Sequence, residues 1–192
     1  MFTRSSKWNV KSIILLALIG IILGVIYTYG FNWAFNLVKM MLLPTGYAPV
    51  TDAVFSGLWL IAGPLAMYFV PTAGSGVVGE TLAAVVEMVI GGQWGATTVL
   101  SGLIQGATNE IGFFPKKERY RKFSWQSVLT GAFFAGLGSF IPTYFLYGWS
   151  KFNVKLQIIM FVTMMLSALL FDGVLVKLIT NLFDRALKPK ID

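Results

Sequence analysis

The residues best suited to chemistry lie in the stretch 74–110, where two apolar segments meet at a short glycine-rich break. The first segment carries Glu80 and Glu87, which are seven positions apart, roughly 20° from alignment on one helix face and about 10 Å apart along its axis. The second segment carries Gln105 and Asn109 in a stripe of small and polar residues at helical spacing. Ionisable side chains in membrane-length segments are costly and mark a functional site by default. We therefore expect a helical pair that lines a small wet pocket.

The two glutamates are the candidate groups for charge recognition or proton transfer, because the chain has no histidine and no cysteine. A bare carboxylate in an apolar segment needs a cation, hydrogen-bond donors or water to compensate it. One interpretation is a protonated glutamate that bonds a neighbouring helix. We favour a site for a ligand that is cationic or rich in N–H donors. The separation of about two helical turns exceeds that of a pair sharing a proton, which argues against an intramembrane enzyme that uses the two carboxylates. We predict no catalytic residue, no metal site and no cofactor.

Aromatic residues near this region could hold a flat cation by their ring faces. Trp94 occupies the break itself, Trp59 lies in the preceding apolar stretch, and Trp33 lies in a more polar stretch before it. Tyr144 and Tyr147 end a later apolar stretch and could close a cage. Anchoring at the membrane interface is the alternative for each of these residues. For Trp94 we favour ligand contact, since the turn around it is mostly glycine.

Two other groups of residues have a packing interpretation as well as a functional one. The amides of Gln105 and Asn109 could simply bond a neighbouring helix, or they could read the polar edge of a heterocycle. Ala17, Gly20 and Gly24 form a small-residue face that lets another helix approach closely. That face could pack inside the same bundle, or it could dock a partner protein.

The composition indicates an integral membrane protein. Hydrophobic residues make up 56% of the 192 and charged residues only 12%, whereas soluble domains carry about a quarter charged residues. The formal net charge of +7 comes from short basic runs beside apolar segments, which fits anionic lipid and membrane topology better than nucleic acid. We find no phosphate-binding loop, so any use of ATP would require another subunit.

Apolar stretches of about 20 residues predict an all-α fold, a compact bundle of six transmembrane helices in a single membrane domain, 1–192. The stretch 31–50 is too broken and amphipathic for a further crossing. We interpret it as an outer loop or interfacial helix with Trp33 and Lys39 at the water boundary. The expected spans are 12–29, 53–70, 72–90, 96–114, 125–147 and 156–177.

The basic residues predict the orientation of the bundle. With both termini in the cytoplasm, twelve Lys and Arg face inside and three face outside, as the positive-inside rule requires. The inside set is Arg4, Lys7, Lys11, Lys116, Lys117, Arg119, Arg121, Lys122, Lys177, Arg185, Lys188 and Lys190, and the outside set is Lys39, Lys151 and Lys155.

The segments GSGVVGETLAAVVEMVIGGQWG (74–95) and GLIQGATNEIGFF (102–114) resemble a known family. They are similar to the substrate-capture (S) components of energy-coupling-factor (ECF) vitamin transporters, of the YkoE type associated with thiamine and its hydroxymethylpyrimidine (HMP) precursor. The architecture of six spans with cytoplasmic ends is similar over the whole chain. The resemblance implies a multi-pass protein of the prokaryotic cell membrane that captures its vitamin from outside without enzymatic activity.

The resemblance also implies partners and roles. A transmembrane coupling subunit and ABC ATPases would supply ATP hydrolysis, and Gly20 and Gly24 are the nearest equivalents of the family's small-residue docking face. For thiamine, Glu80 and Glu87 would supply negative potential and accept from the amino group. Gln105 and Asn109 would satisfy ring nitrogens, while Trp94, with Trp59 or Trp33, would stack on the rings. The alternatives are a stand-alone cation- or proton-coupled carrier and an assembly subunit with no ligand.

Overall fold

The regular structure of the chain is helical throughout the part that a computed structural model describes, residues 7–187. Arg4, Lys188 and Lys190 of the predicted cytoplasmic set lie outside these residues. The α-helices are α1 (Val10–Val25), α2 (Asn32–Leu42), α3 (Val50–Phe55), α4 (Ala62–Phe69), α5 (Ser75–Val89), α6 (Thr97–Asn109), α7 (Lys117–Lys122), α8 (Trp125–Phe145), α9 (Val154–Ser167) and α10 (Val176–Leu187). The predicted all-α class is confirmed.

Several of these helices join end to end. Two π-helical turns, Ile26–Phe31 and Ala168–Leu175, connect α1 to α2 and α9 to α10, and a 3₁₀ turn, Ser56–Leu60, lies between α3 and α4. Four continuous segments of the described chain are therefore long and apolar enough to cross a membrane: Val10–Thr45, Val50–Phe69, Trp125–Phe145 and Val154–Ala186.

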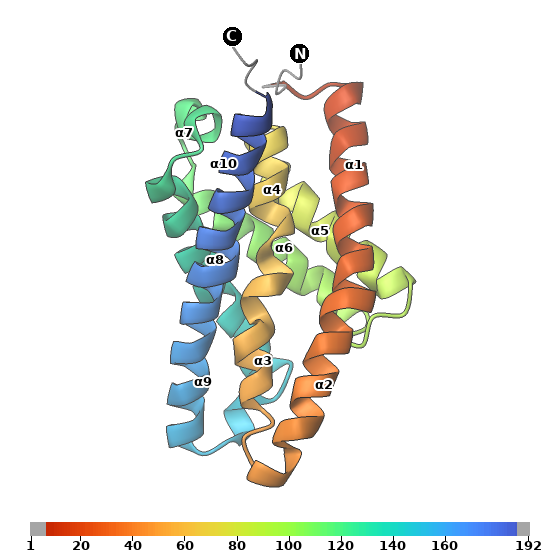
Figure 1. Cartoon of the computed structure of the whole chain (residues 1–192), viewed down its shortest axis with the longest axis vertical. Helices are drawn as coiled ribbons and strands as arrows, with labels where there is room; N and C mark the ends of the chain where they lie inside the picture. Colours follow the sequence, from red (N-terminus) through yellow and green to blue (C-terminus); the bar gives the residue numbers. More distant parts are fainter. Residues whose placement is uncertain (1–6, 188–192) are drawn as a thin grey trace.

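The predicted spans 72–90 and 96–114 form the shorter helices α5 and α6, of 15 and 13 residues. At 1.5 Å per residue they are about 22 and 20 Å long, less than the hydrocarbon thickness of about 30 Å. In Figure 1 they form a hairpin whose turn stops well short of the end of the bundle where α2 meets α3. The structure thus has four full-length crossing candidates, and the hairpin is inserted among them.

The largest difference from the sequence-based expectation is in residues 31–50. A loop or separate interfacial helix was expected, but α2 continues α1 through the π-helical turn, so the loop interpretation is wrong for Asn32–Leu42. This segment is amphipathic because Asn32, Asn36 and Lys39 recur at i, i+4 and i+7 on one face. Asn32 and Lys39 of this face find partners within the protein, whereas Asn36 is exposed.

The small-residue face of the first helix packs against α5. A Cβ atom on Gly20 would lie 2.6 Å from Leu82 Cβ, and one on Gly24 would lie 2.6 Å from Val86 Cβ. Gly20 and Gly24 are therefore covered by α5 inside the bundle, while Ala17 is half-buried. The packing alternative for this face is the one that the structure shows.

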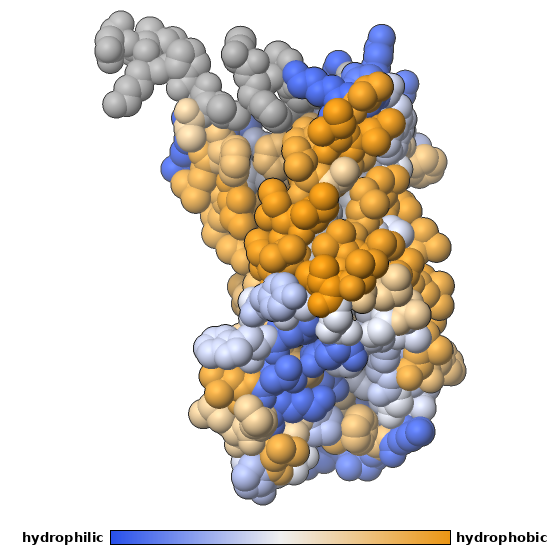
Figure 2. All heavy atoms as spheres, turned by 90° about the vertical axis from the view of Figure 1, so that its right-hand side faces the viewer, coloured by the Kyte–Doolittle hydropathy of each residue, from blue (hydrophilic) through white to orange (hydrophobic). Residues whose placement is uncertain are grey.

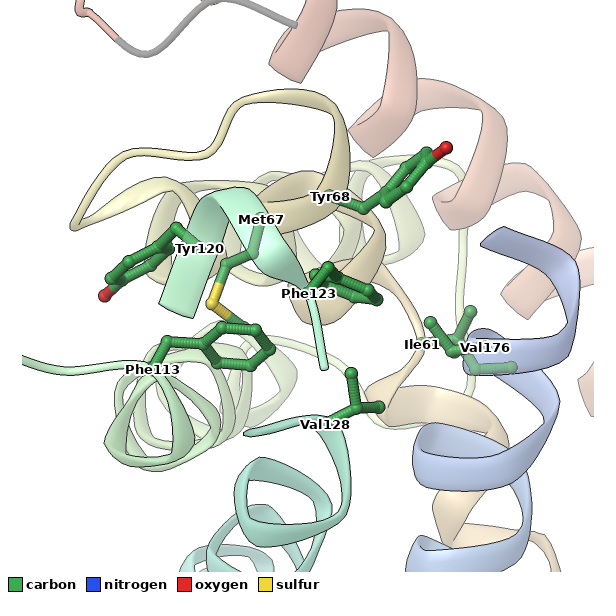
Figure 3. Close-up of a cluster of buried hydrophobic side chains, with 8 residues drawn as sticks. All are labelled: Ile61, Met67, Tyr68, Phe113, Tyr120, Phe123, Val128 and Val176. Atoms are coloured by element: carbon green, nitrogen blue, oxygen red, sulfur yellow. The ribbon is translucent and has the colours of Figure 1, made fainter. Parts of the chain in front are cut away.

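The bundle has a distinct apolar core near the end where α1 begins, α10 ends and α7 lies (Figure 1). Figure 3 shows this core cluster, whose members come from α4, α7, α8, α10 and the segments beside them. It consists of Ile61, Met67, Tyr68, Phe113, Tyr120, Phe123, Val128 and Val176. On the face shown in Figure 2, an apolar band covers this half of the molecule, and a hydrophilic patch interrupts the surface of the other half.

Candidate ligand-binding site

A pocket opens in the half of the bundle opposite the core cluster. The empty space within it is about 670 Å³, including the part that is open to solvent. Residues from both halves of the chain contribute to it, and they surround the C-terminal end of α5 and the turn that follows. The lining comprises Tyr27, Asp52, Ser56, Trp59, Glu80, Ala84, Glu87, Trp94, Thr98, Ser101, Gln105, Ser139, Thr143, Tyr147, Trp149 and Met164.

Five of the eight residues predicted to bind a ligand line this pocket: Glu80, Glu87, Trp59, Trp94 and Gln105. The helical pair α5–α6 brings the two glutamates and Gln105 together. Close approach of these helices depends on small residues, since a Cβ atom on Gly102 would lie 2.7 Å from Ala84 Cβ. The stripe of polar and small residues in 74–110 thus identified the core of the pocket.

Three predicted residues lie elsewhere. Asn109 is 1% exposed and donates from Nδ2 to Asp172 Oδ2 at 2.7 Å, so it makes the cross-helix bond that was its alternative. Trp33 is 68% exposed on the outer face of α2, which fits its alternative role as an anchor at the membrane interface. Tyr144 packs on Phe140, with ring centroids 5.3 Å apart, and leaves Tyr147 to face the pocket.

Sequence reasoning missed several lining residues. Tyr27 lies in the first π-helical turn, Asp52 in α3 and Trp149 just after α8. Asp52 carried a signal, because it is an acidic residue at the start of an apolar stretch. Trp149 carried none, since an aromatic residue at the end of a span is typical of an interfacial anchor.

Glu80 is buried and accepts a short hydrogen bond from α4. Its Oε2 atom accepts from the backbone N–H of Gly63 at 2.6 Å, and the side chain is 2% exposed. The Tyr27 hydroxyl lies beside this carboxylate and accepts from Ala62 N at 2.9 Å. For Glu80, therefore, the bond to a neighbouring helix is observed, and it is shorter than the bond of 3.2 Å that Glu87 accepts from Asn32.

Glu87 is held more loosely. Its Oε1 atom accepts from Asn32 Nδ2 at 3.2 Å, and its Oε2 atom accepts no hydrogen bond from the described residues. The indole N–H of Trp59 is buried beside the Glu87 carboxylate, and it makes no other hydrogen bond among the described residues. Among residues 7–187, neither Glu87 nor Glu80 forms a salt bridge. A buried carboxylate with an unused oxygen can accept from a cation or an N–H donor.

The third carboxylate of the pocket already has a cation. Asp52 pairs with Lys39 of α2 at 3.1 Å, and the Lys39 ammonium also lies 4.9 Å from the centroid of the Phe35 ring. Of the three acidic side chains that line the pocket, Glu87 is consequently the one best placed to meet a charged ligand.

Aromatic rings cover the Glu87 end of the pocket. The Trp94 ring centroid lies 5.7 Å from Phe35, 6.3 Å from Trp59 and 5.3 Å from Tyr147. The turn that carries Trp94 needs glycine at Gly91 and Gly95, whose φ angles are +90° and +61°. Negative charge beneath ring faces is an arrangement suited to a flat cationic or N–H-rich molecule.

The fold and the pocket define a multi-pass, all-helical membrane protein with a pocket lined by acidic and aromatic side chains. Residues 11–138 match the family described as ABC-type cobalt transport system, permease component, and the chain belongs to that family.

Two particular relatives refine this assignment. A Bacillus subtilis (strain 168) protein, YkoE, named as a candidate HMP/thiamine permease, is 28% identical over 175 residues, covering 91% of this chain and 84% of its own length. The crystal structure of an S component of an ECF transporter has a TM-score of 0.81 and 26% identity, covering 94% of this chain and 87% of its own. The resemblance to S components of the YkoE type is confirmed.

Proposed function

We propose that this chain captures thiamine or its pyrimidine precursor from outside the cell, as the S component of an ATP-driven ECF importer. The observation that carries the proposal is Glu87, buried beneath aromatic rings with one oxygen unused. The names of the relatives, which mention an HMP/thiamine permease and an S component, support the same ligand class and role.

The ligand would use the pocket as follows. Glu87 would accept from the amino group of the pyrimidine or face the thiazolium, and Glu80 would add negative potential from a greater depth. Trp94 and Trp59 would cover the rings, and Gln105 would bond a ring nitrogen. Capture requires no catalytic step, and the ATP hydrolysis that drives import would come from ABC ATPases joined through a coupling subunit.

The proposed orientation has both termini in the cytoplasm and six crossings, with the short α5–α6 hairpin counted as two. It rests on the basic residues: those of α7 and Arg185 lie at the end opposite the pocket, whereas Lys39 lies beside it (Figure 1). The pocket would then open toward the outside. The relatives do not favour a stand-alone proton-coupled carrier.

The test is a titration of the purified protein with thiamine and with neutral hydroxymethylpyrimidine, by isothermal calorimetry or tryptophan fluorescence. Glu87→Gln keeps the shape and removes the charge, so we expect thiamine affinity to fall about 30-fold or more, because losing one partner of a buried charge contact costs roughly 2 kcal/mol or more. The neutral pyrimidine should lose much less. Glu118→Gln, on an exposed side chain of α7, is the control and should change neither affinity.

Two results would count against the proposal. Equal losses for the two ligands would exclude charge recognition by Glu87. No binding of either ligand by the wild-type protein would exclude the ligand class itself. Thiamine uptake by the chain alone in liposomes, driven by a proton gradient, would instead support the stand-alone carrier.

A further inference from the structure

Asn32 has both ends of its side chain engaged at the edge of the pocket. It is the first residue of α2, directly after the π-helical turn, and it is 6% exposed. Its Nδ2 atom donates to Glu87 Oε1 at 3.2 Å, and its Oδ1 atom accepts from Gln93 Nε2 at 3.0 Å. A buried amide with both groups paired is a specific connection between α2, α5 and the turn after α5.

The chemistry of this position requires an amide. Glu87 offers an acceptor and Gln93 offers a donor, so the residue between them must donate on one side and accept on the other. An aspartate could not donate to Glu87, and an aliphatic side chain could do neither. The two partners also fix which way the Asn32 amide points.

The bond to Glu87 sets the direction of the carboxylate. With Oε1 tied to Asn32, rotation of the carboxylate is restricted, and Oε2 is left for a ligand. A contact to a charged group gains most when that group is already oriented, since no freedom is then lost on binding.

The bond from Gln93 restrains the turn that carries Trp94. Gly91 and Gly95 have positive φ angles, and a Cβ atom on either would meet nothing within 4 Å, so packing does not hold these two positions of the turn. Gln93 itself is exposed, and its described side-chain bond is the one to Asn32. Holding Gln93 therefore helps to hold the neighbouring Trp94 against Phe35 and Tyr147.

We infer that Asn32 is a positioning residue, which sets the charge contact of Glu87 and the aromatic cover of Trp94 through one side chain. This inference rests on the proposed function and assigns a role to a residue outside the ligand's own contacts. Its consequence is that the two parts of ligand recognition, the charge contact of Glu87 and the aromatic cover of Trp94, are coupled. Loss of Asn32 loosens both of them, whereas loss of Gln93 loosens only the aromatic half.

The experiment measures thiamine and hydroxymethylpyrimidine affinity, and the dissociation rate of each, for four variants. Asn32→Leu should weaken thiamine about 10-fold, as expected for loss of a hydrogen bond to a buried charged group, and weaken the neutral pyrimidine less. Gln93→Leu should speed dissociation of both ligands by a similar factor, about 3-fold, and leave their affinity ratio unchanged. Asn36→Leu, on an exposed residue one turn along α2, is the matched control and should stay within about 2-fold of wild type.

The double variant Asn32→Leu/Gln93→Leu distinguishes positioning from general weakening. Because the Gln93 bond ends on Asn32, the double variant should be no weaker than Asn32→Leu alone, whereas independent effects would multiply. The inference is overturned if the affinity losses of the two single variants multiply in the double variant, or if Asn32→Leu binds thiamine within 2-fold of wild type. In either case, ligand binding by the wild-type protein would still support the proposed function. If Asn32→Leu does not fold, the exposed Gln93→Leu decides: unchanged dissociation of both ligands overturns the inference. If the wild-type protein binds neither ligand, both proposals fail.

Discussion

The two ends of α5 each hold a buried glutamate, and the two differ in how completely the protein satisfies them. At the N-terminal end, Glu110 accepts from the backbone N–H groups of Gly74, Gly76 and Val77, at 2.9, 2.7 and 3.3 Å, and from Tyr120 Oη at 3.0 Å. At the C-terminal end, Glu87 accepts one described side-chain bond, from Asn32.

The difference separates a structural carboxylate from one available to a ligand. Glu110 caps the start of α5, where free N–H groups and the helix dipole favour negative charge, and its oxygens are saturated. Glu87 lies where α5 ends, a position that the dipole disfavours for an anion, and it keeps an unused oxygen. The same residue type thus fixes the hairpin at one end and leaves it ready for a partner molecule at the other.

Removing Glu110 should have the largest effect. Glu110→Ala leaves three backbone N–H groups and the Tyr120 hydroxyl without their acceptor, and each buried group left unpaired costs about 1–3 kcal/mol. We expect a loss of at least about 3 kcal/mol in the free energy of unfolding, or no folded protein, as measured by thermal unfolding in detergent. Glu118→Ala, with its side chain 82% exposed, is the control. Equal melting temperatures for the two variants would contradict the structural role.

Trp94→Ala tests the opposite end and should act on binding rather than on stability. Loss of a ring face over a flat cation costs about 2 kcal/mol, or about 30-fold in thiamine affinity. The unfolding temperature should fall less than for Glu110→Ala, because the Trp94 ring loses contacts to Phe35, Trp59 and Tyr147 but no buried hydrogen-bonding group loses its partner. Trp33→Ala removes a ring of the same kind that is 68% exposed and outside the pocket, and it should leave affinity unchanged. Similar losses of thiamine affinity for both variants would contradict the assignment of Trp94 to the ligand contacts.

Tyr120→Phe should have the smallest of these effects. It removes one of the four donors to Glu110, and we expect a loss of about 1 kcal/mol in stability with no change in thiamine affinity. Burial, with the neighbouring Glu110 carboxylate, raises the pKa of Tyr120, so the phenol remains a donor through the neutral and mildly alkaline range. The stability difference between wild type and variant should therefore be constant from pH 6 to 9. A difference that vanishes across that range would show that the bond does not contribute.

Local sequence patterns were sufficient for the helix class and for the core of the site. Long apolar runs identified the four continuous spans, and the polar residues inside 74–110 led to Glu80, Glu87 and Gln105. These features follow from the cost of burying polar groups, which is independent of how the helices are arranged.

Helix rotation and partner choice could not be read from local patterns. Tyr144 and Tyr147 are equally aromatic and three residues apart, yet only packing against Phe140 turns one away from the pocket. Asn109 was assigned to the ligand because its actual partner, Asp172, lies 63 positions away in the chain and no local pattern connects the two. Glu110 is six and seven positions from Lys116 and Lys117 in the sequence, yet its oxygens accept from backbone N–H groups of residues 74–77.

The first π-helical turn, Ile26–Phe31, sets the direction in which the second half of the long first segment faces. A π turn holds about one more residue than an α turn, and each residue rotates an α-helix by about 100°. If the same residues relaxed into a regular α-helix, everything after the turn would rotate by about that angle. Asn32 and Lys39 would then turn away from Glu87 and Asp52 together, although neither side chain had been changed.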